Sequence, residues 1–536
     1  MHTEKTALIS VYHKDGIVEF AKRLIALGWR LLASGGTARH LGAAGVVVTD
    51  VADKVGEPIL GHRVVTLSRE VHAGLLAKDT PEDSAELKRL GIDRIGLVCV
   101  DLYPLENAIA KPDATLTSVL ELMDIGGPTM LSSASKGEER IVICDPADRE
   151  SVLAMLESRL PFDGEFREHL AAKADFVVSK YRMLTTRYRG KGAFEAIHGT
   201  HFATCLYGEN AYQTPAALYS TNSDDPLALD KFQLVDGKPM GYNNWCDLDR
   251  ALQTITHIAA GLEVNTGEFP LMAVGVKHGN PCGVSYGIDW SGILQQVIEG
   301  DQLAIMGGLI MTNFTIREEQ ADVLLTHKMP TGKRRLIDVI AARSFSPEAL
   351  GNLKRKGDKC RMVANEELIK IGLHSLDTAP RFRYVRGGFL KQPNYTYVPN
   401  FSDGSVVCHG APRLDLVPDL VLAWAIGSTS NSNTVTLVKY GMLIGNGVGQ
   451  QDRVGAAELA IARARRSGHD IKDAVAYSDS FFPFDDGPRT LVDAGVDAIF
   501  TSSGSVHDND TIALCKERGV TLYMVPDKIG RGFYGH

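Results

Sequence analysis

Residues 272–283 read MAVGVKHGNPCG and set two candidate catalytic side chains beside each other. The apolar run 272–276 is followed by Lys277 and His278, and the chain then turns into Gly-Asn-Pro. A short β-type run that ends in glycine and proline predicts a strand followed by a tight loop, and such loops commonly carry catalytic groups. An ammonium beside an imidazole favours the neutral, basic imidazole, which suits proton transfer. The structural alternative is that Lys277 ends a strand in solvent and His278 caps the loop.

The composition describes a multidomain globular protein without an obvious polyanion-binding surface. The chain has 536 residues, of which 44% are hydrophobic and 23% charged, and its net charge is -8. This balance argues against nucleic-acid binding, although a local basic pocket for a phosphate is compatible with it. The sequence holds no membrane span and no signal-peptide layout, so we expect a cytoplasmic protein without membrane partners. Its eight scattered cysteines, with no CxxC pair, predict reduced thiols and no structural zinc site.

The first part of the chain alternates strands and helices. Strands are predicted over 6–11 and 29–33, with a helix over 16–27 between them, and this order is typical of a parallel sheet. Ser-Gly-Gly-Thr at 34–37 follows the second strand, and the next helix is expected from Ala38. A turn of this kind points backbone N–H groups at an anion, so it is a candidate phosphate site.

The alternation continues to about residue 200. Strands are expected over 95–100 and 140–144, and a helix beginning at Pro128 would present Lys136. The polar segment 179–203 has a helical pattern and is interpreted as a connector. We therefore expect a first domain over 1–200, a size within the usual range.

Residues 201–536 form a second α/β region, which we expect to contain two lobes dividing near residue 400. Strands are predicted around 336–342 and 434–438, and polar or glycine-rich turns follow apolar runs at several places. These turns include STSNSN at 428–433, IGNGVGQQDR at 444–453 and DSFFPFDD at 479–486.

Three familiar chemistries do not fit these motifs. Pro281-Cys282 lacks the second cysteine and the upstream H-x-E of a zinc deaminase. The IGNGVGQQ run lacks the third glycine and the following acidic residue of a dinucleotide fingerprint. No serine nucleophile elbow is present. The chemistry left is polar, performed by Lys, His, Asn and Asp on phosphate-bearing substrates without a metal.

The motifs, taken in order, resemble the bifunctional purine-biosynthesis family that joins AICAR transformylase to IMP cyclohydrolase. The resemblance is collinear from residue 5 to the C-terminus. In the first domain it rests on SV-x-x-K-x-G (10–16), SGGTA (34–38), R-V-x-T-L (63–67), VHAG (71–74), LYP (102–104) and DIGGPTML (124–131). In the second region it rests on YGEN (207–210), VKH-x-NPCG (276–283), SN-x-V (432–435), G-x-G-x-GQQ-x-R (445–453) and SD-x-FFPF (478–484).

The resemblance implies a fold and two successive reactions. The first domain would have a methylglyoxal-synthase-like parallel sheet, and the second region would have cytidine-deaminase-like α/β lobes. The second region would transfer a formyl group from 10-formyltetrahydrofolate to AICAR, and the first would close the product, FAICAR, to IMP with loss of water. The expected partners are these nucleotides, folate and a second copy of the chain, with the transformylase sites at the dimer interface.

The same resemblance assigns roles in formyl transfer. The amine of AICAR is a poor nucleophile, so His278 would take its proton, while Lys277 stabilises negative charge or protonates the leaving folate nitrogen. Asn433 would orient the formyl group. The other implied substrate-binding residues are Tyr207, Gly307, Arg453, Phe482, Asp486 and Arg531.

For ring closure, Tyr103, Asp124 and Lys136 stand at three of the family's catalytic positions. The nucleotide-binding positions are Lys14, Ser34, Gly36, Thr37, Arg63 and Thr66.

Five positions depart from the family's motifs, and they bear on both reactions. Val65 stands where the cyclohydrolase lysine belongs, Ser68 replaces a His, and Asp101 replaces an Asn. Leu206 and Tyr212 replace an Arg and a His, and Leu206 removes a bidentate contact to substrate. One interpretation is that Lys14 or Arg69 takes the place of the missing lysine and ring closure is retained. The alternatives are a monofunctional transformylase with an impaired cyclohydrolase domain, a non-catalytic purine-nucleotide-binding homologue, and an enzyme for a modified substrate.

Overall fold

The computed structural model describes residues 5–61, 63–158 and 160–535. Its contacts divide the chain into two compact units, 1–198 and 199–536. The division falls inside the segment 179–203 that the sequence marked as a connector. Much of that segment is not a linker, because helix α10 runs over Gly164–Gly190 and strand β6 begins at Thr200.

The first unit contains a five-stranded parallel sheet with the order β3-β2-β1-β4-β5. Its strands are β1 (Lys5–Ser10), β2 (Trp29–Ala33), β3 (Thr49–Asp50), β4 (Ile95–Val100) and β5 (Ile141–Ile143). Its helices are α1 (Ile17–Ala26), α2 (Gly35–Ala43), α3 (Ala52–Val55), α4 (Arg69–Leu76), α5 (Pro81–Leu90), α6 (Leu105–Ile109), α7 (Leu116–Glu121), α8 (Gly126–Lys136), α9 (Arg149–Glu157) and α10.

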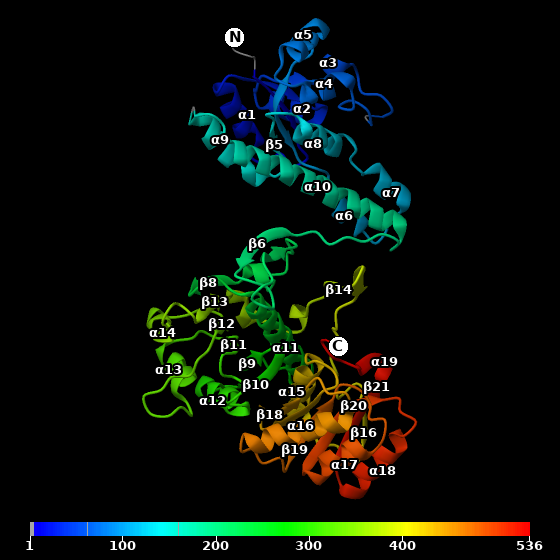
Figure 1. Ribbon diagram of the computed structural model, residues 1–536. Helices are drawn as coiled ribbons and strands as arrows, with labels where there is room; N and C mark the ends of the chain where they lie inside the picture. Colours follow the sequence, from blue (N-terminus) through cyan, green and yellow to red (C-terminus); the bar gives the residue numbers. More distant parts are fainter. Residues whose placement is uncertain (1–4, 62, 159, 536) are drawn as a thin grey trace. The chain divides into compact units, whose positions relative to one another are not determined.

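Helices cover both faces of this sheet (Figure 1). Because successive side chains of a strand point to opposite faces, Ala7 and Ile9 pack with α1, α2 and α9, whereas Leu8 packs with α4, α8 and α10. Burial on both faces explains the apolar strand sequences. The predicted parallel-sheet class is confirmed for this unit.

The glycine turn at 34–37 is part of a helix and not a separate loop. Ser34 is the N-cap of α2, and Gly35, Gly36 and Thr37 form its first turn. The helix therefore begins three residues before the Ala38 start that the sequence suggested. Because the N–H groups of Ser34 and Thr37 bond the carbonyls of Ile9 and Ser34, the donors that this first turn leaves for a ligand are those of Gly35 and Gly36.

The second unit is built on a twelve-stranded mixed sheet with the order β16-β21-β20-β19-β17-β18-β10-β9-β11-β12-β13-β8. These strands are β8 (Gln233–Asp236), β9 (Leu271–Lys277), β10 (Asn280–Gly287), β11 (Leu309–Thr312), β12 (Val339–Ala342), β13 (Arg361–Ala364), β16 (Val407–His409), β17 (Val435–Lys439), β18 (Met442–Gly447), β19 (Ala474–Ser478), β20 (Val496–Ser503) and β21 (Thr521–Pro526). Two hairpins stand apart from it: β6 (Thr200–Cys205) with β7 (Ala216–Ser220), and β14 (Arg381–Val385) with β15 (Gly388–Gln392).

The helices of this unit are α11 (Tyr242–Thr266), α12 (Trp290–Gly300), α13 (Glu318–Thr326), α14 (Pro347–Leu353), α15 (Val417–Ser428), α16 (Arg453–Arg466), α17 (Asp486–Asp493), α18 (Asp508–Arg518) and α19 (Asp527–Gly530). None of the helices within the described ranges is both long and apolar enough to cross a membrane.

The sheet joins two halves of the chain at β10 and β18, which pair at Ser285 and Met442. Residues before 365 supply one half and residues after 406 supply the other. The proposed lobe division near residue 400 lies between these halves. Both halves nevertheless share one core cluster, in which α11 packs against α15.

A close contact of α12 with β10 generates the first prediction. A Cβ atom on Gly283 would lie 1.9 Å from the carbonyl oxygen of Val297 in α12. We therefore expect Gly283→Ala to shift backbone and to destabilise the second unit by about 1–3 kcal/mol, measured by thermal unfolding.

Gly351→Ala is the matched control, because Gly351 is a helical glycine of α14 with no atom within 4 Å of an added Cβ. Alanine is the better helix former by up to about 1 kcal/mol, so this variant should melt at or above the wild-type temperature. Equal melting of the two variants would contradict the proposed steric contact.

Candidate active sites

The Lys277-His278 pair lies at the end of a two-residue β-hairpin. Strands β9 and β10 pair from Lys277 with Asn280, so only His278 and Gly279 form the turn. Both residues have left-handed backbones, with φ of 53° and 69°, as a type I′ turn requires. The predicted loop after Lys277 is corrected here, because Asn280 and Pro281 already belong to the returning strand.

Hydrogen bonds from other elements hold this turn. Asp247 of α11 accepts the Gly279 N–H at 2.7 Å, and its carboxylate also interacts electrostatically with His278. Burial raises the pKa of Asp247, and the backbone donor and His278 oppose this effect. Lys277 Nζ donates to the carbonyl of Met306 at 2.6 Å, which directs the ammonium to the segment containing Gly307.

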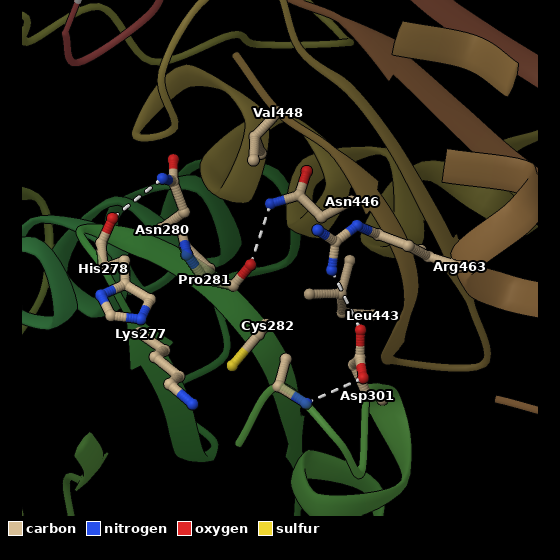
Figure 2. A pocket seen from close by; sticks show the side chains of 13 residues that line it. Lys277, His278, Asn280, Pro281, Cys282, Asp301, Leu443, Asn446, Val448 and Arg463 are labelled. Atoms are coloured by element: carbon tan, nitrogen blue, oxygen red, sulfur yellow. Dashed lines mark hydrogen bonds and ion pairs between the residues drawn. The ribbon is translucent and has the colours of Figure 1, made fainter. Parts of the chain in front are cut away.

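Lys277 and His278 line one end of a cavity of about 300 Å³ (Figure 2). At its other end Asp301 accepts a hydrogen bond from Arg463 at 3.1 Å. Cys282 also lines the cavity, and burial raises the pKa of its thiol to about 12, so a thiolate nucleophile is not available. The ionisable groups that remain are suited to proton transfer and to binding charge.

Asn280 connects the hairpin to the segment that carries Asn433. Its side-chain oxygen accepts the Asn431 N–H at 3.1 Å, and its amide donates to the His278 carbonyl at 3.2 Å. Asn433 is held in turn by two hydrogen bonds to the carbonyl of Gln450, at 3.1 Å from its backbone and 3.0 Å from its side chain. The side chain of Asn280, which the sequence analysis had not selected, thus links His278 to Asn431, two residues before Asn433.

A second group of residues surrounds the buried carboxylate of Asp479. Arg453 pairs with it at 3.2 Å, and the Ser432 hydroxyl donates to it at 2.6 Å. Arg531 lies near the same strand end, because it pairs with Asp527 and stands 5.9 Å from the ring of Phe481. The two arginines predicted to contact a nucleotide therefore flank one segment, 479–481.

Some predicted substrate-binding residues are placed differently. Phe482 is 2% exposed and packs in a core cluster, whereas the neighbouring Phe481 is the ring that faces Arg531. Side chains alternate between the two faces of a strand, but at the strand end the sequence does not show which of two adjacent phenylalanines points outward. Asp486 is exposed at the start of α17. Tyr207, like Leu206 and Tyr212, is exposed and does not line the cavity beside His278.

The first unit contains a separate cavity of about 650 Å³ that opens where the parallel strands end. It is lined by Tyr103 and Asp124 and by all six predicted nucleotide-binding residues of this unit, Lys14, Ser34, Gly36, Thr37, Arg63 and Thr66. Ligands bind at this edge of open α/β sheets.

One side of this cavity has the character of an anion site. Lys14 donates to Thr37 Oγ1 at 3.1 Å, and both lie beside the first turn of α2. Ser34, the N-cap of α2, makes no capping hydrogen bond with its side chain. Burial lowers the pKa of Lys14, although nearby Asp101 opposes the shift. Free helix N–H groups and an ammonium together favour a phosphate.

The other side presents two proton-transfer groups. Burial raises the pKa of Asp124, and its carboxylate accepts the Gly127 N–H at 2.9 Å. Burial and the charge of Asp124 both raise the pKa of Tyr103. A Cβ on Gly127 would come within 2.3 Å of the Asp124 carboxylate, so glycine is needed there.

Lys136 is not brought to this cavity. It is the last residue of α8, whereas Asp124 precedes the first, and eleven helical residues span about 16 Å. Arg69 is likewise absent from the described lining, while Val65 and Asp101 are both present. Within the described residues, no cluster of three or more His, Cys, Asp or Glu side chains suits a metal ion.

Comparisons with known proteins find two family models that match this chain. A model of the AICARFT/IMPCHase bienzyme family matches residues 134–463, and a model of the MGS-like domain matches residues 16–129. The chain is 35% identical over 528 residues to the bifunctional purine biosynthesis protein PurH of Anoxybacillus flavithermus (strain DSM 21510 / WK1), which covers 97% of this chain and 98% of the relative.

A second relative and one solved structure complete the comparison. The PurH protein of Acidithiobacillus ferrooxidans (strain ATCC 53993 / BNL-5-31) is 35% identical over 530 residues, covering 96% of this chain and 97% of the relative. A structure described as the crystal structure of ForH is 37% identical with a TM-score of 0.30, over 34% of this chain and 96% of ForH.

The hydrogen bond between Asn280 and Asn431 generates a structural prediction. Asn280→Ala leaves the Asn431 N–H without its partner, so amide hydrogen exchange over 429–435 should accelerate. Loss of one buried hydrogen bond should cost about 1–3 kcal/mol of local stability.

Asn265→Ala is the control, because Asn265 bonds the Gly261 and Pro399 carbonyls and not this segment. That variant should accelerate exchange near residue 400 only. Unchanged exchange over 429–435 in Asn280→Ala would refute the proposed connection.

Proposed function

Because the chain belongs to the AICARFT/IMPCHase bienzyme family, we propose that its two units divide the two reactions of that family between them. It is a bifunctional enzyme of purine biosynthesis with AICAR formyltransferase and IMP cyclohydrolase activities. The assignment of each reaction to a site rests on one observation above all: the His278-Gly279 hairpin presents a base and an ammonium at the mouth of a cavity. The cavity at α2 of the first unit then serves ring closure.

In formyl transfer, His278 accepts a proton from the amine of AICAR as the amine attacks the formyl carbon. The amine is conjugated to a carboxamide and is a weak nucleophile, so general base catalysis lowers the barrier. Lys277, held by the Met306 carbonyl, stabilises the negative charge that develops on the formyl oxygen or protonates the departing folate nitrogen. The formyl donor is 10-formyltetrahydrofolate, and no step needs a metal.

Binding of the nucleotide uses the polar groups around Asp479. Asn433 orients the formyl group, and Arg453 and Arg531 supply positive charge for the substrate. Phe481, with its ring near Arg531, replaces Phe482 in this proposal. Tyr207, Gly307 and Asp486 keep the substrate-binding roles implied by the family, and Tyr207 and Asp486 are exposed while Gly307 is half-buried.

In ring closure, the phosphate of FAICAR binds at Lys14, Ser34, Gly36 and Thr37, and the base lies toward Tyr103 and Asp124. Both ends of this arrangement line one cavity. Tyr103 is a neutral donor to the formyl oxygen, and burial raises the pKa of Asp124, which makes its carboxylate a stronger proton acceptor.

We further propose a cytoplasmic homodimer with formyl-transfer sites at the subunit interface. The support is the β14–β15 hairpin, whose Tyr384 is 82% exposed and whose Leu390 is 60% exposed. A hairpin that exposes large apolar side chains among basic ones suits burial against a second copy.

A single substitution separates the two reactions. Asn tolerates a left-handed backbone, so His278→Asn keeps the turn and removes the base. We expect kcat of formyl transfer to fall by about 10²–10⁴ while closure of supplied FAICAR to IMP is unchanged. Tetrahydrofolate release and IMP formation are followed chromatographically with AICAR and 10-formyltetrahydrofolate.

Folate turnover at the wild-type rate in His278→Asn would eliminate His278 as the base. FAICAR that accumulates in the wild-type reaction would favour the alternative of an impaired first unit, for which Val65 is the motivating residue.

The dimer has its own test. Sedimentation should give twice the chain mass for the wild type, and the double substitution Tyr384→Ser with Leu390→Ser should favour the monomer and slow formyl transfer. Tyr440→Ser, at an aromatic residue that is 74% exposed elsewhere in the unit, is the control. A fully active monomer would disprove the shared-site proposal.

A further inference from the structure

At the end of the first-unit cavity near Tyr103 and Asp124, each lysine or arginine among the described lining residues already has a polar partner. Among its described lining residues, Lys14 bonds the Val11 carbonyl and Thr37, and Arg63 pairs with Glu121 at 2.6 Å. Val65 presents only an apolar side chain, half-buried against the core. Ring closure in this cavity therefore depends on groups that move protons.

Asp101 is such a group, and it has no role so far. It lines the same cavity as Tyr103, Asp124 and Val65, at the end of β4. Its carboxylate accepts the backbone N–H groups of Tyr12 and His13, so the carboxyl plane is fixed. The side chain is 8% exposed, and burial raises its pKa.

The groups that face Asp101 come from several elements. Arg149 of α9 lies 3.8 Å from it, and His13 and Lys14 follow β1. Cys99 lies two residues before it in β4. The cations and backbone donors lower the pKa of Asp101, but burial has the larger effect, which brings the carboxylate closer to the range of an effective general base.

We propose that Asp101 is a catalytic proton-transfer residue of ring closure, acting with Tyr103 and Asp124 to replace the lysine that Val65 displaces. This inference rests on the proposed use of the cavity for FAICAR. The two departures, at 65 and 101, then form one compensated change: a cation is lost and a carboxylate is gained in the same cavity.

The proton transfers balance over two steps. In the first, Asp101 takes a proton from the carboxamide nitrogen as this nitrogen bonds to the formyl carbon. Asp124, protonated, gives its proton to the formyl oxygen, and Tyr103 donates a hydrogen bond to it. In the second, Asp101 returns its proton to the hydroxyl, which leaves as water, and Asp124 takes the proton of the former formamide nitrogen as the C=N bond forms. Both carboxyls end as they began.

The test compares Asp101→Asn in two backgrounds with FAICAR supplied directly. In the wild-type background we expect kcat of ring closure to fall on the order of 100-fold. IMP affinity and formyl transfer should stay unchanged, and the melting temperature should fall equally in both backgrounds, because Asn can accept only one of the two backbone N–H bonds. In the Val65→Lys background, Asp101→Asn should lower kcat of ring closure by no more than about tenfold, because the lysine again stabilises the oxyanion. A purely structural role for Asp101 would not be rescued by a lysine at 65.

The outcomes are distinct. Full ring closure by Asp101→Asn refutes the inference and leaves the proposed function standing. An equal loss of kcat in both backgrounds, with IMP binding retained, also refutes the inference and leaves the proposed function unaffected. If the wild type does not close FAICAR to IMP, the proposed function of the first unit is refuted, and so is the inference that depends on it.

Discussion

The contact between α11 and α15 determines where the formyl-transfer residues lie. A Cβ on Gly261 would come within 2.6 Å of Val421 and 3.0 Å of Trp424, so the helices approach as closely as a glycine allows. Every residue of α15 from Leu420 to Ser428 is buried. Because the shared core lies under both halves of the sheet, the halves cannot move independently of this pair.

Polar groups at the ends of these helices connect the rigid core to the site by hydrogen bonds. Asp247, near the start of α11, fixes the hairpin turn. Arg250, one turn later, is buried and donates to the Thr429 carbonyl, to Asn431 and to the Tyr534 carbonyl. The catalytic hairpin, the Asn433 segment and the C-terminal residues are therefore all anchored to one helix. A general base acts efficiently only when it is held in a fixed position relative to the group that it deprotonates, and these anchors fix that position.

The sequence predicted the chemistry of the sites better than their local backbone. Lys277 and His278 were recognisable because a strand delivered them together, and the phosphate-binding turn because glycines follow a strand. The hairpin was missed because His-Gly is not the usual Asn-Gly signal of a type I′ turn. Asn280, Phe481 and Asp247 depend on contacts between residues distant in the chain, for which a single sequence has no signal. Lys136 does not line the cavity of Tyr103 and Asp124, because the eleven residues of α8 place it at the far end of that helix.

The single pairing of β10 with β18 has a consequence for how this chain can be divided. A gene cut near residue 400 would separate two strands of one sheet and leave each fragment with an open β edge and half of a shared apolar core. Such edges recruit other strands. The two fragments would therefore be soluble only when co-produced, and they would reassemble by pairing β10 with β18. A cut between the two compact units at residue 198 would instead leave both cores intact.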